Sequence, residues 1–182
     1  MWVAVALPIR LARTLLFVAL LPTLAFAAAC SGAPTEDVDT SDVAADEAEL
    51  TTVTLDAQEQ AFFTKINQYR ASHGLAKLRL SPALTRASIA HSKDMAAHGV
   101  LAHDSSDGTP WDKRIRKYYT INTIIGENVA FGYDTGAEVF AGWEASPPHD
   151  KNMLLGSFHA IGIARVVDKN GTAWWTTDFG GK

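Results

Sequence analysis

Cysteine is nearly absent from this chain: Cys30 is the only one in 182 residues. A single cysteine cannot form an intramolecular disulfide, so the hydrophobic core alone must stabilise the folded part. Basic and aromatic residues are absent from residues 31–55, which carry seven acidic side chains. Such a segment cannot bury enough apolar surface to offset the entropy of ordering it, so residues 30–55 are predicted to form a disordered acidic tether.

Two motifs of common enzyme classes are also missing. The chain has no G-x-S-x-G nucleophile elbow and no glycine-rich phosphate loop of recognised spacing. Cys30 lies outside the segment expected to fold, which excludes a cysteine nucleophile.

The N-terminal segment, residues 1–29, has the pattern of an export signal. Arg10 and Arg13 form a positive region, an apolar run follows, and small residues precede Cys30. The alternative is a retained membrane anchor, but the run is near the lower limit for spanning a bilayer and Pro22 interrupts it.

Cys30 follows three alanines, and this junction resembles a bacterial lipobox. The resemblance implies that Cys30 is lipidated and becomes the mature N-terminus, with Ser31 fitting outer-membrane sorting. Ala27 stands where the usual lipobox has leucine. The alternative is cleavage after Ala27, which leaves Cys30 as a free thiol.

Residues 56–182 have the length of one ordinary domain. They carry 14 Lys and Arg against 13 Asp and Glu, a net charge of +1, while the whole chain is at −4. The acidity therefore belongs to the tether, and no basic surface for nucleic acid is expected.

Helical periodicity, caps and turn residues predict an α+β domain, with helices packed on a small sheet. The predicted helices start at Asp56, at Pro82, near 110 and near 135; extended stretches are expected at 78–80, 160–167 and 173–179, with a turn at 168–171 and a helix break at Pro147-Pro148. The buried stripe of the second helix is predicted to be Leu84, Ala87, Ala90-His91, Asp94-Met95 and His98.

Histidines and acids supply the candidate chemistry. His91 and His98 share one helix face with Asp94, but their spacing of seven is typical of core or boundary histidines rather than a metal pair. His103 and Glu127 lie in separate segments that could converge on one site.

His149 stands three residues before Asn152, which could orient its imidazole on a helical turn. Ser146 lies three residues before His149, and with Glu127 or Glu144 as the acid the two would allow a Ser–His–acid hydrolase. Ser146 before Pro147 is equally a helix-terminal serine.

Four segments and the final strands together resemble the CAP superfamily, the SCP-like extracellular domains of cysteine-rich secretory proteins, antigen 5 and pathogenesis-related 1, and in particular its bacterial branch. These segments are Leu84 to His103, Asp107 to Arg114, Gly126-Glu127-Asn128-Val129-Ala130, and the Trp143, Ser146, His149, Asn152 pattern. The resemblance implies an α-β-α sandwich. It also implies a cleft with two histidines and two glutamates, which in some members holds a divalent cation such as zinc.

Carried over by motif, His103 is the first histidine and Glu127 the first glutamate. Ser146 stands where the second glutamate is expected, and that departure weakens the expected affinity for metal. His149 is the expected second histidine and His159 its rival. The predicted cleft is therefore His103, Glu127, Ser146, His149 and Asn152, with His103 and His149 as metal ligands.

Three functions are compatible with this resemblance. The first is an exported, lipid-anchored envelope protein that binds a lipid or small apolar ligand, a divalent cation or an envelope protein partner in the cleft. The second is a metal-assisted hydrolase, a protease or esterase with Glu127 as general base and His149 in the candidate catalytic set. The third is a structural envelope protein.

Overall fold

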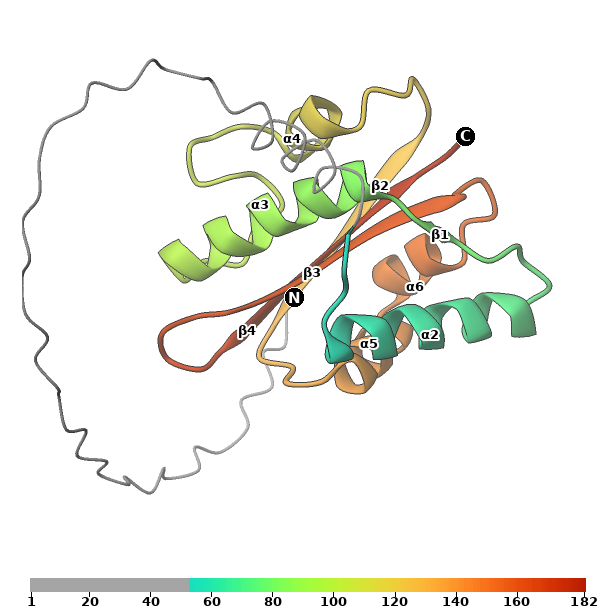
Figure 1. Ribbon diagram of the computed structural model, residues 1–182, viewed down its shortest axis with the longest axis horizontal. Helices are drawn as coiled ribbons and strands as arrows, with labels where there is room; N and C mark the ends of the chain where they lie inside the picture. Colours follow the sequence, from blue (N-terminus) through green and yellow to red (C-terminus); the bar gives the residue numbers. More distant parts are fainter. Residues whose placement is uncertain (1–52) are drawn as a thin grey trace, which may run out of the picture. The chain divides into compact units, whose positions relative to one another are not determined.

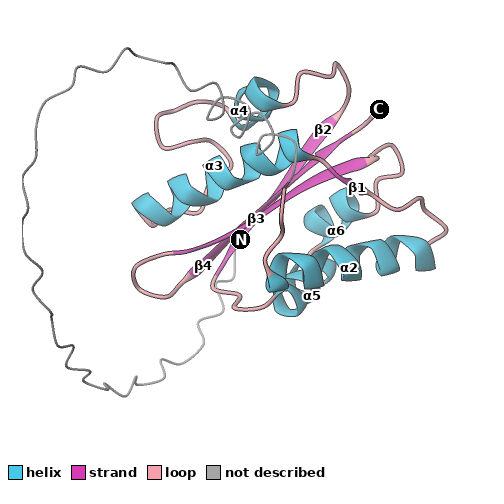
Figure 2. Cartoon of the chain, viewed as in Figure 1, coloured by secondary structure: helices cyan, strands magenta, loops and turns pink. Residues whose placement is uncertain are grey.

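Residues 53–182 are described by the computed structural model, and they fold as a four-stranded sheet between two layers of helices (Figures 1 and 2). The predicted export signal, Cys30 and nearly all of the tether lie outside the described residues. The elements are, in chain order, α2 (Ala57–Ser72), β1 (Arg79–Leu80), α3 (Pro82–His98), α4 (Trp111–Tyr118), β2 (Ile125–Phe131), α5 (Gly136–Glu144), α6 (Pro147–Met153), β3 (Ala160–Val167) and β4 (Ala173–Gly180).

The sheet has the order β1-β3-β4-β2. β1 runs parallel to β3, whereas β4 pairs antiparallel with β3 on one side and with β2 on the other. Every residue of β4 is buried, because this strand has a neighbour on each side and helices on both faces. β2 is an edge strand, and it carries the Gly126-Glu127-Asn128 motif.

Alternate residues of the strands face two separate cores. On one face α2, α5 and α6 pack on Trp175 and Phe179 of β4. On the other face α3 and α4 cover the sheet, with Leu84 and Ile115 in one cluster and Met95 in another beside Trp174. This arrangement is the predicted α-β-α sandwich.

Local sequence signals set the helix ends as expected. Asp56 caps α2 and forms a capping box with Glu59. Ser81 caps α3 ahead of Pro82, and Gly99 ends that helix with a φ of 65°, a left-handed conformation that glycine adopts without strain. The predicted turn at 168–171 joins β3 to β4. Leu55, which the sequence places in the tether, packs against the core.

Two expectations about helices were wrong in part. Pro147-Pro148 does not simply interrupt a helix: α5 has ended at Glu144, and the prolines occupy the first turn of α6. Proline is tolerated there because the N–H groups of a first turn have no partner within the helix.

The buried stripe of α3 differs from the prediction: it leaves out Ala90, Asp94 and His98 and instead includes Thr85, Ser88 and Ser92. Leu84, Ala87, His91 and Met95 are buried as expected. The side chain of His98 is 55% exposed and contacts Asp94, whose carboxylate accepts bonds from Ser106. These two residues therefore face the loop after α3 and solvent rather than the core.

Arg70 is fully buried and joins α2 to the segment after α6. Its guanidinium donates to the carbonyl oxygens of Ala76, Met153, Leu155 and Phe158 at 3.0, 2.7, 3.1 and 3.2 Å. Burial lowers the pKa of this guanidinium. One charged side chain thus satisfies backbone acceptors of an irregular segment that has few other donors.

Across residues 53–182, the helices are all too short or too polar to span a bilayer.

Gly162 of β3 gives a direct test of the packing between α3 and the sheet. A Cβ atom there would lie 2.1 Å from the backbone carbon of Leu84 and 2.3 Å from the backbone nitrogen of Thr85. Gly162→Ala is therefore expected to lower the free energy of unfolding by more than about 2 kcal/mol, measured by urea denaturation. Gly156→Ala is the matched control, because its Cβ would meet only Leu75 at 3.6 Å. An equal effect of the two variants would contradict the close approach of α3.

Candidate functional site

Glu127 is the centre of the candidate site. It lies on β2 with its side chain 1% exposed, on the face that α3 and α4 cover. Gly126 before it leaves room for the ring of Phe158, since a Cβ on Gly126 would lie 2.7 Å from that ring. The glycine of the motif thus allows the other face of β2 to be packed tightly, which fixes the strand that carries the carboxylate.

Both carboxylate oxygens of Glu127 accept bonds from charged or titratable donors. Nδ1 of His103 lies 2.8 Å from Oε1, and Nη2 of Arg114, on α4, donates to Oε2. The other terminal nitrogen of Arg114 donates to the carbonyl oxygen of His103 at 2.8 Å and to Oγ of Ser105 at 3.1 Å. Arg114 therefore fixes both the carboxylate and the loop that carries its second partner.

His91 supports this loop from α3. It is fully buried, and its Nε2 lies 2.8 Å from the carbonyl oxygen of Ala102. Because a carbonyl can only accept, Nε2 carries the hydrogen. Burial lowers the pKa of His91, which fits a neutral imidazole. His91 is thus a core histidine with a hydrogen-bond partner, and it positions the loop next to His103.

Asp178 adds a second acid beneath the site. It pairs directly with Glu127 across β4 and β2, is fully buried, and accepts a bond of 2.9 Å from Oγ of Ser88. Burial raises the pKa of Asp178 well above its usual value, and the neighbouring Glu127 raises it further. The raised pKa favours the neutral form of Asp178, and Glu127 is the acid in direct contact with the guanidinium of Arg114.

His149 approaches from α6, which packs with α5 and α2 on the opposite face of the sheet. Its Nδ1 lies 2.9 Å from Oγ of Ser146. The amide of Asn152 instead donates to the carbonyl oxygen of Glu127 at 3.0 Å and to Oδ1 of Asn128 at 2.9 Å. The expectation that Asn152 orients His149 was therefore wrong: Asn152 ties α6 to β2, and Ser146 contacts the imidazole.

The two candidate histidines have opposite electrostatic surroundings. The bond to Glu127 raises the pKa of His103, whose side chain is 53% exposed. Burial lowers the pKa of His149, and the charge of His103 lowers it further. The structure thus gives two contacting pairs, His103 with Glu127 and His149 with Ser146, and the charge of His103 acts on His149. His159, the rival second histidine, contacts the carbonyl oxygen of Ser157 instead.

Sequence reasoning missed two members of this network. Arg114 and Asp178 both stand in the motifs that carry the family resemblance, but neither has a local partner that marks it. Only the register of β2 against β4 places Asp178 beside Glu127. A charged residue within a strand that is otherwise largely apolar was the available signal for Asp178.

The residues present do not fit a divalent metal ion. Within residues 53–182, no three His, Cys, Asp or Glu side chains are gathered so that they could hold one. The carboxylate of Glu127 already accepts bonds from Arg114 and His103, so a metal could use it as a ligand only by displacing one of them. The predicted role of His103 and His149 as metal ligands thus gains no support from this geometry.

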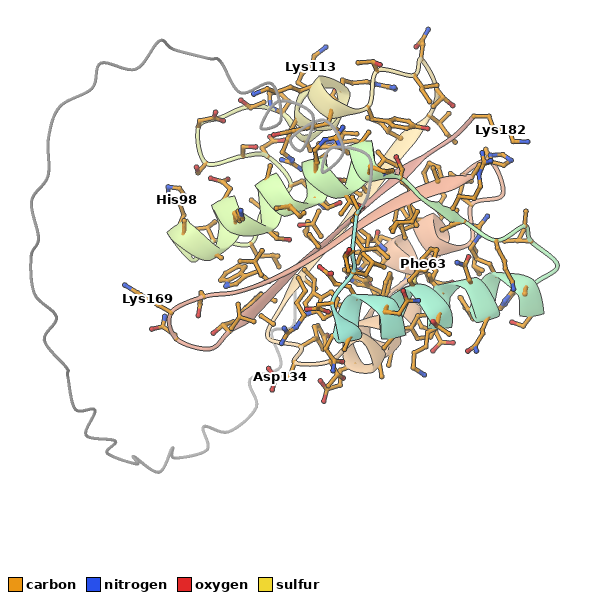
Figure 3. All side chains as sticks on the ribbon, in the orientation of Figure 1. Phe63, His98, Lys113, Asp134, Lys169 and Lys182 are labelled. Atoms are coloured by element: carbon orange, nitrogen blue, oxygen red, sulfur yellow. The ribbon has the colours of Figure 1, made fainter. Side chains whose placement is uncertain are left out.

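A surface hollow of about 480 Å³ lies at another place. Its lining comes from the last turn of α3 and the β3–β4 turn, where His98 and Lys169 stand at the same end of the domain (Figure 3). None of the residues predicted for the cleft lines it.

The fold and these residues together define a CAP domain: a mixed sheet between two helical layers, with histidine and glutamate side chains at the edge strand. Residues 63–179 match the sequence profile of the CAP (cysteine-rich secretory protein) family. The chain belongs to this family.

Relatives place it beside bacterial members. It is 32% identical over 127 residues to the uncharacterized protein YkwD of Bacillus subtilis, a match that covers 69% of this chain and 48% of the relative. This chain thus corresponds to about half of that relative.

Solved structures show the same fold. An outer surface protein of Borrelia burgdorferi has a TM-score of 0.66 at 19% identity, over 71% of this chain and 96% of that one. An extracellular protein of Bacillus anthracis that contains an SCP domain has a TM-score of 0.61 at 25% identity, over 72% and 45% of the two chains.

The opposite pKa shifts can be measured by NMR titration of the histidine side chains. His103 is expected to titrate above about 6.5 and His149 below it. By linkage, the His103–Glu127 contact stabilises the fold below the unfolded pKa of about 6.5, and this contribution is lost as pH rises through the folded pKa. His149 has the reverse sign: its contribution is present above about 6.5 and is lost as pH falls through its lowered pKa. Glu127→Gln should move the titration of His103 downward; an unchanged midpoint would refute the assigned cause.

Proposed function

We propose that this protein is an exported CAP domain of a bacterial cell envelope that binds an amphipathic ligand, a lipid with an acidic head group, at the site of His103, Glu127, Ser146 and His149. The observation that carries the proposal is the half-exposed imidazole of His103 on a carboxylate that is 1% exposed. The buried carboxylate of Glu127 orients the imidazole of His103, and a ligand in solvent can reach the exposed part of the ring.

The chemistry of His103 favours a hydrogen-bond acceptor as the ligand group. The carboxylate of Glu127 accepts from Nδ1, so Nδ1 carries a hydrogen, and the raised pKa favours a second hydrogen on Nε2. Nε2 then offers a charged donor to a carboxylate or phosphate oxygen. His149, whose pKa is lowered, adds a neutral imidazole that introduces no second charge.

Apolar side chains stand immediately before this donor. Val100 is 58% exposed and Leu101 is 43% exposed, and only Ala102 separates them from His103. Single exposed apolar residues are ordinary, but two in succession beside a charged imidazole suit a ligand that has an apolar tail and an acidic head. This combination favours a lipid over a divalent cation, which would meet the positive charges of His103 and Arg114.

The hydrolase alternative receives less support. A general base must reach the proton that it removes, whereas the carboxylate of Glu127 is buried and both of its oxygens already accept bonds. In the described part of the chain, the imidazole of His149 contacts the hydroxyl of Ser146, and no carboxylate holds the other side of that ring as in a catalytic triad.

The extracellular location of the relatives supports export, and the anchor rests on the junction at Cys30. The Borrelia burgdorferi protein lies on the outer surface, and the Bacillus anthracis protein is extracellular. Cys30 lies outside the described residues, so its lipidation is inferred from the sequence before it. The acidic segment that follows would hold the domain away from the membrane surface.

Ligand binding can be tested by calorimetric titration of the purified chain with laurate at pH 6 and pH 8. We expect tighter binding at pH 6, where His103 is charged, and at least about tenfold weaker binding by His103→Ala. His98→Ala is a matched control, because His98 is 55% exposed and also contacts an acid. Equal affinities of wild type and His103→Ala would contradict the proposal.

The anchor has a separate test. Cys30→Ser in cells that make the full chain should move the protein from the membrane fraction to the soluble fraction, assayed by immunoblotting. Incorporation of labelled palmitate should be lost in the same variant. An unchanged distribution would rule out a lipid on Cys30, whatever the result with laurate.

A further inference from the structure

We propose that the guanidinium of Arg114 takes the place of a divalent metal ion in the His103–Glu127 site. The site therefore binds its ligand without a metal ion. The inference takes the location of the site from the proposed function. Its test measures metal binding and folding rather than ligand binding, so that the two proposals can fail independently.

The contacts of Arg114 resemble the coordination of a bound cation. The guanidinium is 6% exposed and contacts one carboxylate oxygen of Glu127, the carbonyl oxygen of His103 and the hydroxyl of Ser105. These are one charged and two neutral oxygen donors from β2 and from the loop before α4. A guanidinium presents its hydrogens in a fixed plane, so it sets the relative position of the groups that it bridges.

The charges around Arg114 balance with a single cation. The groups that face it are Glu127, Asp178, His91 and His103, and the first two are the acids. Burial and the charge of Glu127 raise the pKa of Asp178 well above its usual value, which favours its neutral form, and Glu127 is the acid that contacts Arg114 directly. One guanidinium compensates one buried carboxylate, and a divalent cation would leave an excess positive charge in a site with little solvent.

Arg114 also blocks the oxygens that a metal would use. One oxygen of Glu127 accepts from the guanidinium and the other from His103. An ion that took Glu127 itself as a ligand would have to displace one of these donors, and Ser146 supplies a hydroxyl, not a carboxylate, on the side of His149.

Calorimetric titration of the full chain with zinc at pH 7 tests whether the His103–Glu127 site binds a divalent metal ion. We expect no saturable binding of one zinc ion that depends on His103. Weak binding that persists in His103→Ala belongs to exposed histidines such as His98 and leaves the proposal intact. Binding of one zinc ion that is lost in both His103→Ala and Glu127→Gln would overturn it.

A double-mutant cycle, followed by thermal unfolding, tests whether Arg114 compensates the charge of Glu127. Arg114→Met should lower Tm by about 10 °C, because it removes the guanidinium that compensates the buried carboxylate of Glu127 and leaves it only the bond to the half-exposed His103. Arg114→Lys keeps the positive charge, so its Tm should fall by less. Arg114→Met/Glu127→Gln removes both charges and should recover at least half of the loss. If Arg114→Met does not fold, a folded double variant supports the assignment. A double variant no more stable than Arg114→Met would overturn the assignment.

Discussion

The bond between Arg114 and Glu127 is the interaction on which the rest of the site depends. It joins α4 to the edge strand β2 and, through the carbonyl oxygen of His103, fixes the loop after α3. A carboxylate with 1% exposure cannot stay charged without compensation, because burial removes its hydration. The guanidinium supplies that compensation and directional bonds together, so one contact holds three segments that are separate in the sequence.

This arrangement gives the two sides of Glu127 different roles. Towards the core, Arg114 and the wholly buried Asp178 form a closed polar layer between the sheet and α3. Towards solvent, His103 is the member of the network that an external molecule can reach. The buried part determines the orientation and proton affinity of His103, and the exposed part determines what binds. Rigid support beneath an accessible donor is what a binding site requires for selectivity.

The sequence predicted what depends on neighbouring residues. Asp56, Ser81 and Gly99 act within a few positions of themselves, so their capping roles could be recognised from spacing. Arg70, by contrast, bonds carbonyl oxygens more than 80 residues away, and Asp178 meets Glu127 only through strand register. Neither contact has a periodic signature. The error about Asn152 has the same origin: helical spacing relates it to His149, whereas the packing of α6 on β2 directs its amide to Asn128.

The neutral side chain of Ser146 fits the same balance of charges around Glu127. The resemblance to the family implies a second glutamate at this position, and a carboxylate there would add a negative charge beside His149. With Arg114 already bonded to Glu127, that charge would need a further cation. A serine hydroxyl contacts Nδ1 of His149 at 2.9 Å without adding charge. It therefore lets His149 stay neutral, as its lowered pKa requires. The hydroxyl at position 146, in place of an acid, and the buried Arg114 are thus two parts of one electrostatic arrangement.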